Sequence, residues 1–446
     1  MIIIKRLKAV ARKVYYSSSA ALVRCTGRVF GYLPIKKNKI VLDNFLGKEL
    51  GDNTGAIARE LSNTPDLDIV WLAHKHVTDI PAPIRKVRIG SLRAFYELAT
   101  AKIWVDNVRN TPRPPKRKGQ YYLQTWHGSY GPKLVEADVP KGTLSESYIR
   151  AAKEDGRITD AIIIHSKLQE EIFRRAFWLN ENTEYLKIGL PRNDVMFEDN
   201  TAVLEKLKQE LKLKEDDYVI LYAPTFRDDG STSAYITDFG PILAGFQAKT
   251  GRKCKVIIRL HPNVPEQKKI YNFDDVILNG TDYPRIQDLF GICHAMITDY
   301  SSSSADFGYL KKPIYLYLSD FDAYKASGRV GDEILSYPFP ISFNVKELCS
   351  QIKDFDQGIY EKDIDVFYER NPHSGGNRRP WSGAGTAVWI SHGQSESARR
   401  TAIAGGGRLR VGGRAGGRRA LSRRDQRGRA ADGGRFRPGD GGDQPD

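Results

Sequence analysis

Short apolar runs and amphipathic stretches alternate along the first part of the chain. Strand-like runs cover 39–45, 68–74, 85–89 and 102–107, and apolar residues at helical spacing cover 53–61 and 92–101. Runs that are apolar throughout are typical of parallel strands buried on both faces, and the helices between them supply the crossovers. The pattern therefore predicts a parallel sheet, with Asp52 or Asn53 capping the first helix.

The same alternation of strand-like runs and amphipathic stretches continues to residue 318. Further strands are predicted at 121–125, 160–166, 185–188, 218–223, 255–262, 275–280, 295–300 and 313–318, with helices at 167–177, 203–211 and 281–290. A chain of 446 residues is too long for a single core. We therefore predict an α/β fold with two domains, 36–198 and 199–370, and a change of domain between about 195 and 205.

A serine-rich turn, 301–304, separates the last two predicted strands, and a short helix follows it. Hydroxyls and free backbone N–H groups in such a turn point at one place, and the positive end of a helix adds to them. The turn therefore suits a phosphate group. The alternative is that these serines only cap the helix and hold no ligand.

Polar side chains also follow two other predicted strands of the second domain. Thr225 and Arg227 come after 218–223, and Arg259, His261 and Pro262 stand at the end of the run that begins at 255. The carboxyl ends of parallel strands share one edge of a sheet, so these side chains and the turn from Thr298 onward are expected to lie together. Two arginines, a histidine and a helix N-terminus make an anion site.

In the first domain, His127 and Gly128 follow the predicted strand at 121–125. An imidazole at a strand end can take a proton from a hydroxyl near neutral pH, and Lys133 adds positive charge to the same loop. The alternative is a histidine that only packs. The turn 189–194 presents Arg192, Asn193 and Asp194, which we expect to be exposed.

Charge and cysteine content narrow the class of protein. The net charge of +15 is uneven, since residues 371–446 carry 15 Arg, 6 acids and no Lys, which leaves +6 for the rest. A mildly basic body gives no expectation of nucleic-acid binding. The four cysteines are widely spaced, without metal-ligand spacing, and are expected to be reduced thiols.

Both ends of the chain differ from its body. Residues 1–16 carry five basic residues and no acid, with Ile3, Leu7, Val10 and Val14 on one helical stripe. We expect 1–35 to lie on an anionic membrane surface; a solvated helix packed on the body and a signal peptide are the alternatives. The tail, 371–446, has 18 Gly. We interpret it as disordered or as translation in a shifted frame from about residue 373; a Gly/Arg RNA-binding tail is the alternative.

Five motifs in this order resemble the CDP-glycerol glycerophosphotransferases that polymerise teichoic acids. They are TWHGS, GLPRND, YAPTFRDD, RLHP and TDYSSSSADFGYLKKPIYLY, within a resemblance from about 40 to 370. The resemblance implies two Rossmann-like domains in a glycosyltransferase-B-like arrangement. It also implies a CDP-polyol donor bound by the second domain and a lipid-linked polymer acceptor entering from the first. Such proteins are peripheral at the cytoplasmic face of the bacterial cell membrane.

The resemblance also implies roles for single residues. His127 is similar to the base that activates the acceptor hydroxyl, His261 faces the donor diphosphate, and Asp299 orients the serine turn or a neighbouring histidine. These three are the catalytic candidates. The substrate-binding candidates are Lys133, Asn193, Thr225, Arg227, Arg259, Thr298, Ser301 and Ser302, with Asn193 and Arg227 as the weaker matches. Ser303, Ser304 and Ala305 extend the turn with small residues, which leaves glycerol and ribitol both open.

The implied reaction is attack of an acceptor hydroxyl on the β-phosphorus of a CDP-polyol, with release of CMP. No cofactor or metal is expected, although Asp228, Asp229 and Asp299 leave room for Mg²⁺. Two other functions stay open: a nucleotide-sugar glycosyltransferase of similar fold, and a nucleic-acid-binding protein that acts through the tail. Single addition and polymerisation are not distinguished by the sequence.

Overall fold

The structure is a computed structural model, and it describes residues 26–27, 29–109, 113–129, 131–227, 229–261 and 270–370. The expected membrane helix at 1–16, the tail from 371, Asp228 and Pro262 lie outside these residues. Both sheets described below belong to one compact unit of the chain, Met1–Ala404. Within the described part, no helix is both long and apolar enough to cross a membrane.

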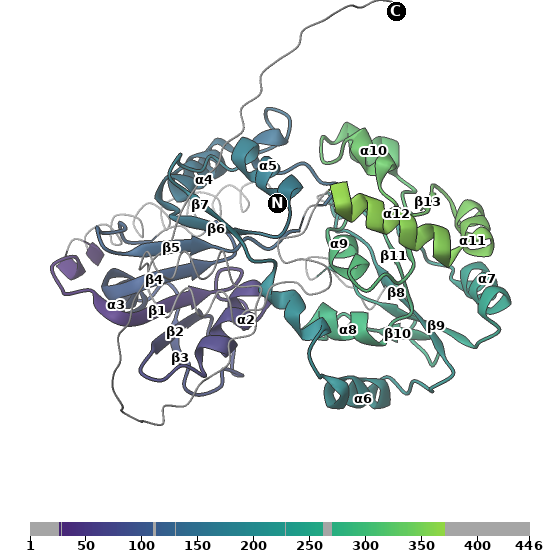
Figure 1. The fold of residues 1–446 in the computed structure, drawn as a ribbon, viewed down its shortest axis with the longest axis horizontal. Helices are drawn as coiled ribbons and strands as arrows, with labels where there is room; N and C mark the ends of the chain where they lie inside the picture. The colour runs from purple at the N-terminus through teal and green to yellow at the C-terminus, as the bar shows by residue number, and fades with distance from the viewer. Residues whose placement is uncertain are drawn as a thin grey trace, which may run out of the picture. The chain divides into compact units, whose positions relative to one another are not determined.

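The first half of the chain forms a seven-stranded sheet in which every pair of neighbours is parallel (Figure 1). Its order is β3-β2-β1-β4-β5-β6-β7. The strands are β1 (Lys36–Asp43), β2 (Asp68–Ala73), β3 (Arg85–Arg88), β4 (Ala101–Asp106), β5 (Tyr121–Gln124), β6 (Ala161–Ile164) and β7 (Glu184–Lys187). The helices are α2 (Asp52–Leu61), α3 (Leu92–Thr100), α4 (Glu146–Ile158) and α5 (Lys167–Ala176), with a 3-10 turn η1 (Glu136–Asp138).

Alternate residues of the first sheet enter cores on its two faces. Ile40 and Leu42 pack with Ile57 of α2, whereas Val41 packs with Ala94 and the rest of the α3 face. Side chains on neighbouring positions of a strand point to opposite faces, so a strand covered by helices on both sides must be apolar throughout. This accounts for the unbroken apolar runs in the sequence.

The second half forms a six-stranded, all-parallel sheet in the order β10-β9-β8-β11-β12-β13. Its strands are β8 (Tyr218–Ala223), β9 (Cys254–Ile258), β10 (Ile277–Asn279), β11 (Ala295–Thr298), β12 (Ile314–Tyr317) and β13 (Ile341–Ser342). Its helices are α6 (Thr201–Glu210), α7 (Gly240–Thr250), α8 (Ile286–Ile292), α9 (Ser303–Gly308), α10 (Phe321–Ala326), α11 (Val345–Asp354) and α12 (Gln357–Arg370). Two 3-10 turns, η2 (Pro191–Met196) and η4 (Asp332–Ser336), complete the elements used below.

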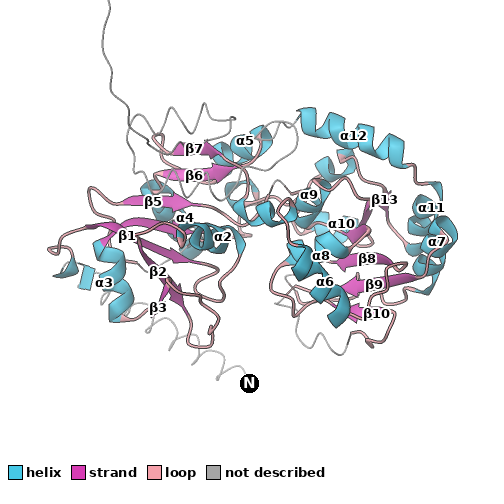
Figure 2. Cartoon of the chain, turned by 60° about the horizontal axis from the view of Figure 1, so that its bottom comes forward, coloured by secondary structure: helices cyan, strands magenta, loops and turns pink. Residues whose placement is uncertain are grey.

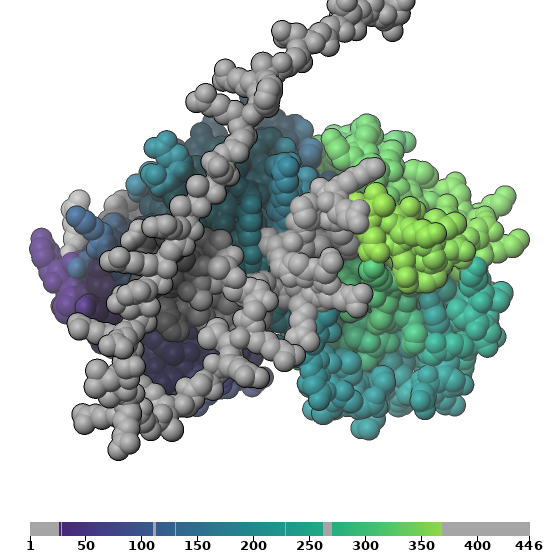
Figure 3. Space-filling model, in the orientation of Figure 1, coloured from purple at the N-terminus to yellow at the C-terminus, as the bar shows by residue number. Residues whose placement is uncertain are grey.

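Helices cover both faces of this sheet as well (Figure 2). Ile220 of β8 enters a core with Phe246 of α7 and Ile352 of α11. Leu221, the next residue, enters the opposite core with Phe290 of α8 and residues of α9 and α12. Helix α12 lies over that second core with most of its residues exposed, and it is seen at the surface in Figure 3.

The strand polarity fixes where a site can lie. In the second sheet the chain runs from β8 to β9 on one side, and β11 lies on the other side of β8, so the order reverses between β8 and β11. In open parallel sheets, ligands bind outside the carboxyl ends of the strands at such a reversal. That edge holds the residues after Ala223, Ile258 and Thr298, as the sequence predicted.

Most predicted elements are present, and the differences have local causes. Strand β13 and helices α4, α7, α10, α11 and α12 were not predicted; β13 has two residues and α10 six, which is too short for a periodic pattern to show in the sequence. The predicted cap of the first helix is wrong, since Gly51 is the N-cap and Asp52 is already helical. The Asn53 side chain instead donates to the carbonyl oxygen of Trp126 at 3.1 Å.

Gly156 in α4 lies against the chain at the end of α5. A Cβ on Gly156 would be 2.4 Å from the carbonyl oxygen of Trp178 and 2.9 Å from that of Phe177, and backbone atoms cannot rotate away. We expect Gly156→Ala to lower the free energy of unfolding by about 1–3 kcal/mol. The matched control is Gly245→Ala in α7, where the nearest atom is 3.8 Å away and helix propensity favours alanine by up to about 1 kcal/mol. Thermal unfolding of both variants tests this, and an equal midpoint for the two would contradict it.

Candidate active site

A pocket of about 360 Å³ opens at the carboxyl edge of the second sheet. Loops after three of its strands line the pocket, together with residues of α8, α9 and α10, one residue after α10, and one residue of the loop that follows β5. The lining residues are Lys133, Ala223, Pro224, Thr225, Phe226, Arg259, Leu260, His261, Ile286, Ser301, Ser303, Tyr324 and Arg329. The edge predicted from strand polarity therefore contains a cavity lined by cationic and hydroxyl side chains.

The serine turn lines the pocket with Ser301 and Ser303, whose hydroxyl oxygens lie 2.8 Å apart. Ser302, a predicted ligand, does not line it. The carbonyl oxygen of Ser302 accepts a hydrogen bond from the Ser129 hydroxyl at 2.8 Å. The backbone at Gly131 also packs against Ser302, since a Cβ on Gly131 would be 2.9 Å from the Ser302 Cβ. Helix α9 has six residues, so its dipole adds little to anion binding. The serine turn offers an anion its hydroxyls and backbone N–H groups instead.

Asp299 lies beneath this turn and fastens it to the loop after β8. Its Oδ1 accepts from the backbone N–H of Tyr300 at 2.7 Å and from that of Thr225 at 2.8 Å, and its Oδ2 pairs with Arg227 at 2.9 Å. The carboxylate therefore orients the turn, which was one of the two roles predicted for it. It is a positioning group in this geometry, since it is buried and absent from the pocket lining.

Arg227 and Thr298 also hold the loops and do not line the pocket. The Arg227 guanidinium bonds both oxygens of Asp320, at 2.7 and 3.0 Å, as well as Asp299 and the Thr225 carbonyl. The Thr298 hydroxyl donates to the Ala223 carbonyl at 2.7 Å, which ties β11 to β8. Both were predicted to bind substrate; the structure places them outside the pocket lining, where they hold the loops that form it.

Thr225 differs from these two because it lines the pocket. It is 5% exposed, and within the described residues its hydroxyl oxygen has no hydrogen-bond partner. A buried hydroxyl without a partner costs free energy unless a ligand or water satisfies it. Thr225 therefore offers a donor to a molecule in the pocket.

Arg259 and His261 line the pocket from the loop after β9. The Nη1 atom of Arg259 donates to the carbonyls of Gly280 and Tyr283, at 3.0 and 2.6 Å, which fixes the guanidinium in place. Burial lowers the pKa of Arg259 to about 10, so it stays cationic at neutral pH. Burial also lowers the pKa of His261, and the charges of Lys133 and Lys48 lower it further.

Lys133 reaches the pocket from the first half of the chain. It forms an antiparallel bridge with Val330, and the N–H of Leu134 donates to the Arg329 carbonyl at 2.9 Å. The loop after β5 is thereby fastened to the wall of the pocket. Lys48, whose charge acts on His261, was missed by the sequence analysis. It follows the end of β1, so the strand-end argument that identified Lys133 could have found it.

His127 follows β5, in the same loop as Lys133. Its Nδ1 lies 2.7 Å from the carbonyl oxygen of Asn107. A carbonyl only accepts, so Nδ1 carries the hydrogen and the lone pair of Nε2 is available to take a proton. Burial lowers the pKa of His127, which keeps the ring neutral at pH 7. The rings of Trp126 and Phe45 contact the imidazole, with centroids at 4.3 and 5.2 Å.

The backbone before His127 is strained. Trp126 has φ = 52°, in the left-handed region that bulky residues avoid. Its N–H donates to Gln124 Oε1 at 2.9 Å and its carbonyl accepts from Asn53, which hold this conformation. Strain of this kind persists where surrounding contacts fix it, and it is concentrated at functional sites.

Arg192, Asn193 and Asp194 in the turn 189–194 were expected to be exposed, and this is wrong: the first two are buried and Asp194 is half-buried. Arg192 is 9% exposed and Asn193 is fully buried, because their side chains bond Asp306 in α9. Asn193, a predicted substrate ligand, also accepts from Gln287 at 3.1 Å and does not line the pocket. A polar Pro-containing turn resembles a surface loop in sequence when its partners are distant in the chain.

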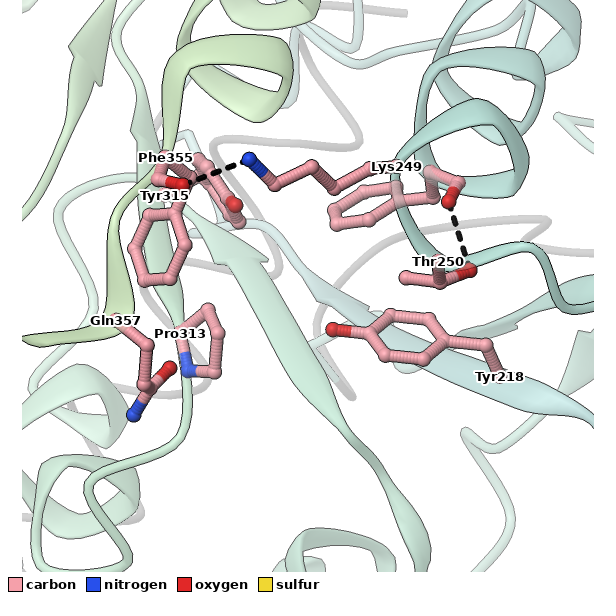
Figure 4. A pocket seen from close by; sticks show the side chains of 8 residues that line it. Tyr218, Lys249, Thr250, Pro313, Tyr315, Phe355 and Gln357 are labelled. Atoms are coloured by element: carbon pink, nitrogen blue, oxygen red, sulfur yellow. Dashed lines mark hydrogen bonds between the residues drawn. The ribbon is translucent and has the colours of Figure 1, made fainter.

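Two further observations concern metals and other cavities. The described residues contain no group of three or more His, Cys, Asp or Glu side chains that could hold a metal ion. A second hollow, of about 270 Å³, opens among Tyr218, Tyr315 and Phe355 (Figure 4). Tyr218 is the first residue of β8, so this hollow lies at the amino edge of the sheet, away from His261. Lys249 spans it and donates to the Phe355 carbonyl at 2.8 Å.

Comparisons with known proteins agree with this geometry. Residues 27–378 match the family model described as CDP-Glycerol:Poly(glycerophosphate) glycerophosphotransferase. The chain is 29% identical over 358 residues to a teichoic acid poly(glycerol phosphate) polymerase of Bacillus spizizenii, covering 77% of this chain and 90% of that protein. It is also 29% identical over 350 residues to a protein of the same name from Staphylococcus epidermidis, covering 75% of this chain and 48% of that protein.

A solved structure is similar as well. A histidine-to-asparagine variant of the wall teichoic acid polymerase TagF, soaked with CDPG, superposes with a TM-score of 0.69 at 25% identity. The match covers 86% of this chain and 97% of that one. This chain thus spans nearly all of one curated relative and about half of another, and the likeness includes both sheets.

Proposed function

This chain belongs to the CDP-glycerol:poly(glycerophosphate) glycerophosphotransferase family, and we propose that it transfers glycerol phosphate from CDP-glycerol to a hydroxyl of a lipid-linked acceptor, releasing CMP. The product extends a teichoic acid or a related cell-surface polymer. The two sheets are two Rossmann-like domains in a glycosyltransferase-B-like arrangement. Their strand orders support this, because each follows the order of doubly wound nucleotide-binding folds.

One observation carries the proposal: a single pocket gathers cations and hydroxyls from both halves of the chain. Lys133 comes from the loop after β5, Arg259 from the loop after β9, and Ser301 and Ser303 from the loop after β11. Lys48 adds a further charge that acts on His261. Cations and hydroxyl donors at this density are suited to the two phosphates of a nucleoside-diphosphate alcohol.

The proposed reaction needs one proton transfer and charge neutralisation. The acceptor hydroxyl gives its proton to Nε2 of His127 while its oxygen attacks the β-phosphorus of the donor. A new P–O bond forms to the acceptor, and the bond between the β-phosphorus and the bridging oxygen breaks, so that CMP leaves with that oxygen. Lys133, Arg259 and the serine turn stabilise the charge that builds up on the phosphoryl and leaving oxygens.

Glycerol is the proposed polyol because the two relatives described above are named for glycerol phosphate. Measuring CMP release from CDP-glycerol and CDP-ribitol, with a lipid-linked acceptor present, tests both the donor and the reaction. UDP-glucose serves as the control for a glycosyltransferase. We expect CMP release to be fastest with CDP-glycerol. Release of UDP from the sugar nucleotide, with no CMP from either alcohol, would contradict the proposal.

We also propose that the protein is peripheral at the cytoplasmic face of the membrane, where a lipid-linked acceptor is presented. The support is the basic, acid-free sequence of residues 1–16 with its apolar stripe. Deleting these residues is expected to reduce sedimentation with vesicles that contain anionic lipid, and to have no effect with neutral vesicles, in which the charge attraction is absent. Equal sedimentation of the full chain and the deletion variant on anionic vesicles would remove this part of the proposal.

A further inference from the structure

Arg192 bonds residues of both halves of the chain at once. It lies in η2, between the last strand of the first sheet and helix α6, and its side chain is 8% exposed. Its guanidinium contacts Asp52 in α2, Asp306 in α9 and the backbone of His127. Neither the motif analysis nor the reaction described above gives this residue a role.

On the side of the first sheet, Arg192 fixes the backbone that carries His127. Nη1 donates to the His127 carbonyl oxygen at 2.6 Å and lies 3.3 Å from each oxygen of Asp52. The N–H of Arg192 donates to Oδ1 of Asn53 at 3.2 Å, and Nδ2 of the same asparagine donates to the Trp126 carbonyl at 3.1 Å. Arg192 thus holds the His127 carbonyl directly and the Trp126 carbonyl through Asn53.

On the side of the second sheet, Arg192 fixes the helix that begins at the serine turn. Nη2 and Nε donate to Oδ2 of Asp306, at 2.8 and 3.1 Å. The other carboxylate oxygen accepts from Asn193 at 2.9 Å, so both oxygens of Asp306 are bonded from η2. Asp306 is in the first turn of α9, three residues after Ser303 of the pocket.

We propose that Arg192 is a positioning residue that sets His127 against the serine turn, and so sets the distance between the acceptor base and the donor phosphate. This inference rests on the proposed function. The planar guanidinium suits the task, because its five N–H donors lie in a rigid fork and can serve several acceptors in fixed directions. Displacement of a reacting group by about 1 Å can lower a rate about 100-fold, so a loose connection here reduces turnover without removing any substrate contact.

The test compares Arg192→Lys with a matched buried cation elsewhere. Lysine keeps the charge but cannot bond Asp306 and the His127 carbonyl in the same directions. The control is Lys255→Gln, which removes a buried cation paired with Asp217 at 3.2 Å in the amino-terminal half of β9, away from the pocket. Turnover, CDP-glycerol binding and the unfolding midpoint are measured for both variants below their unfolding temperatures.

We expect Arg192→Lys to lower kcat about 10- to 100-fold, with the Kd of CDP-glycerol within threefold of the wild-type value. Lys255→Gln is expected to lower the unfolding midpoint and keep kcat within threefold. Asp306→Asn should lower kcat to a similar extent, and combining it with Arg192→Lys should add little, because both changes break one connection. If the kcat losses of Arg192→Lys and Asp306→Asn add up in the double variant, the proposal is overturned. It is also overturned if Lys255→Gln loses as much kcat as Arg192→Lys does for the same drop in unfolding midpoint.

A measurement without turnover separates this proposal from the proposed function. The ¹⁵N signals of the His127 ring report its tautomer, with the hydrogen on Nδ1 in the wild-type protein. We expect Arg192→Lys to mix the two tautomers and Lys255→Gln to leave the signals unchanged. If the wild-type protein releases no CMP, the proposed function fails and the ring signals still decide the positioning role. Unchanged His127 signals in Arg192→Lys would overturn that role.

Discussion

Replacing His127 with alanine is expected to lower the turnover of CMP release about 100- to 10,000-fold and to leave CDP-glycerol binding near the wild-type value. The size of the loss is that of removing a positioned general base. Binding is retained because His127 does not line the donor pocket, whereas Lys133, Arg259 and the serine turn do. Turnover assays and calorimetry on the same variant measure the two quantities.

The same account predicts how turnover of the wild-type protein depends on pH. The pKa of His127 is lowered from its ordinary value of 6.5, so the ring is neutral at pH 7 and gains a proton only as the pH falls through that lowered pKa. Turnover should therefore stay level from pH 7 down to about 6.5 and fall below it. The exposed His76, changed to alanine, is the control and should leave the profile unchanged. Near-normal turnover of His127→Ala would show that the histidine is structural.

Replacing His261 with alanine has a different expected result, because this ring lines the donor pocket. Both the affinity for CDP-glycerol and the turnover should fall. A charge-assisted hydrogen bond to phosphate contributes about 1.5–3 kcal/mol, which is roughly a 10- to 150-fold increase in Kd. Calorimetry with CDP-glycerol measures it. His261→Gln, which keeps a hydrogen-bond donor, serves as the comparison and should recover part of the affinity.

The two histidine variants are informative together. The account requires His127→Ala to separate turnover from binding and His261→Ala to reduce both. If His261→Ala binds CDP-glycerol as tightly as the wild-type protein, the pocket wall at Arg259 and His261 does not hold the diphosphate. The donor would then have to lie elsewhere along the sheet edge.

The sequence predicted the two sheets and the edge of the site because both follow from local patterns. Apolar runs bounded by polar residues give the strands, and strand polarity then places Thr225, His261 and Ser301 on one edge. No long-range information is needed for that step. The histidine after β5 was found by the same argument.

Which of these residues line the pocket and which only hold its loops could not be predicted in this way. Arg227 and Thr298 lie within three residues of lining residues in the sequence, yet their side chains bond Asp320 and the Ala223 carbonyl, which are distant in the chain. Arg192 was predicted to be exposed because its turn is polar. Its buried position depends on an acid more than 100 residues away, Asp306, and on a backbone carbonyl in another loop.

The central claim is that the phosphorus of the donor moves to the acceptor, and one measurement tests it most directly. CDP-glycerol labelled with ³²P in its β-phosphate is incubated with the protein and a lipid-linked acceptor, and the lipid and nucleotide products are separated. The account predicts that the label enters the lipid and that the released CMP is unlabelled. If the label instead stays in released CDP, a nucleoside diphosphate, and the lipid product is unlabelled, phosphoryl transfer and the proposed function are contradicted.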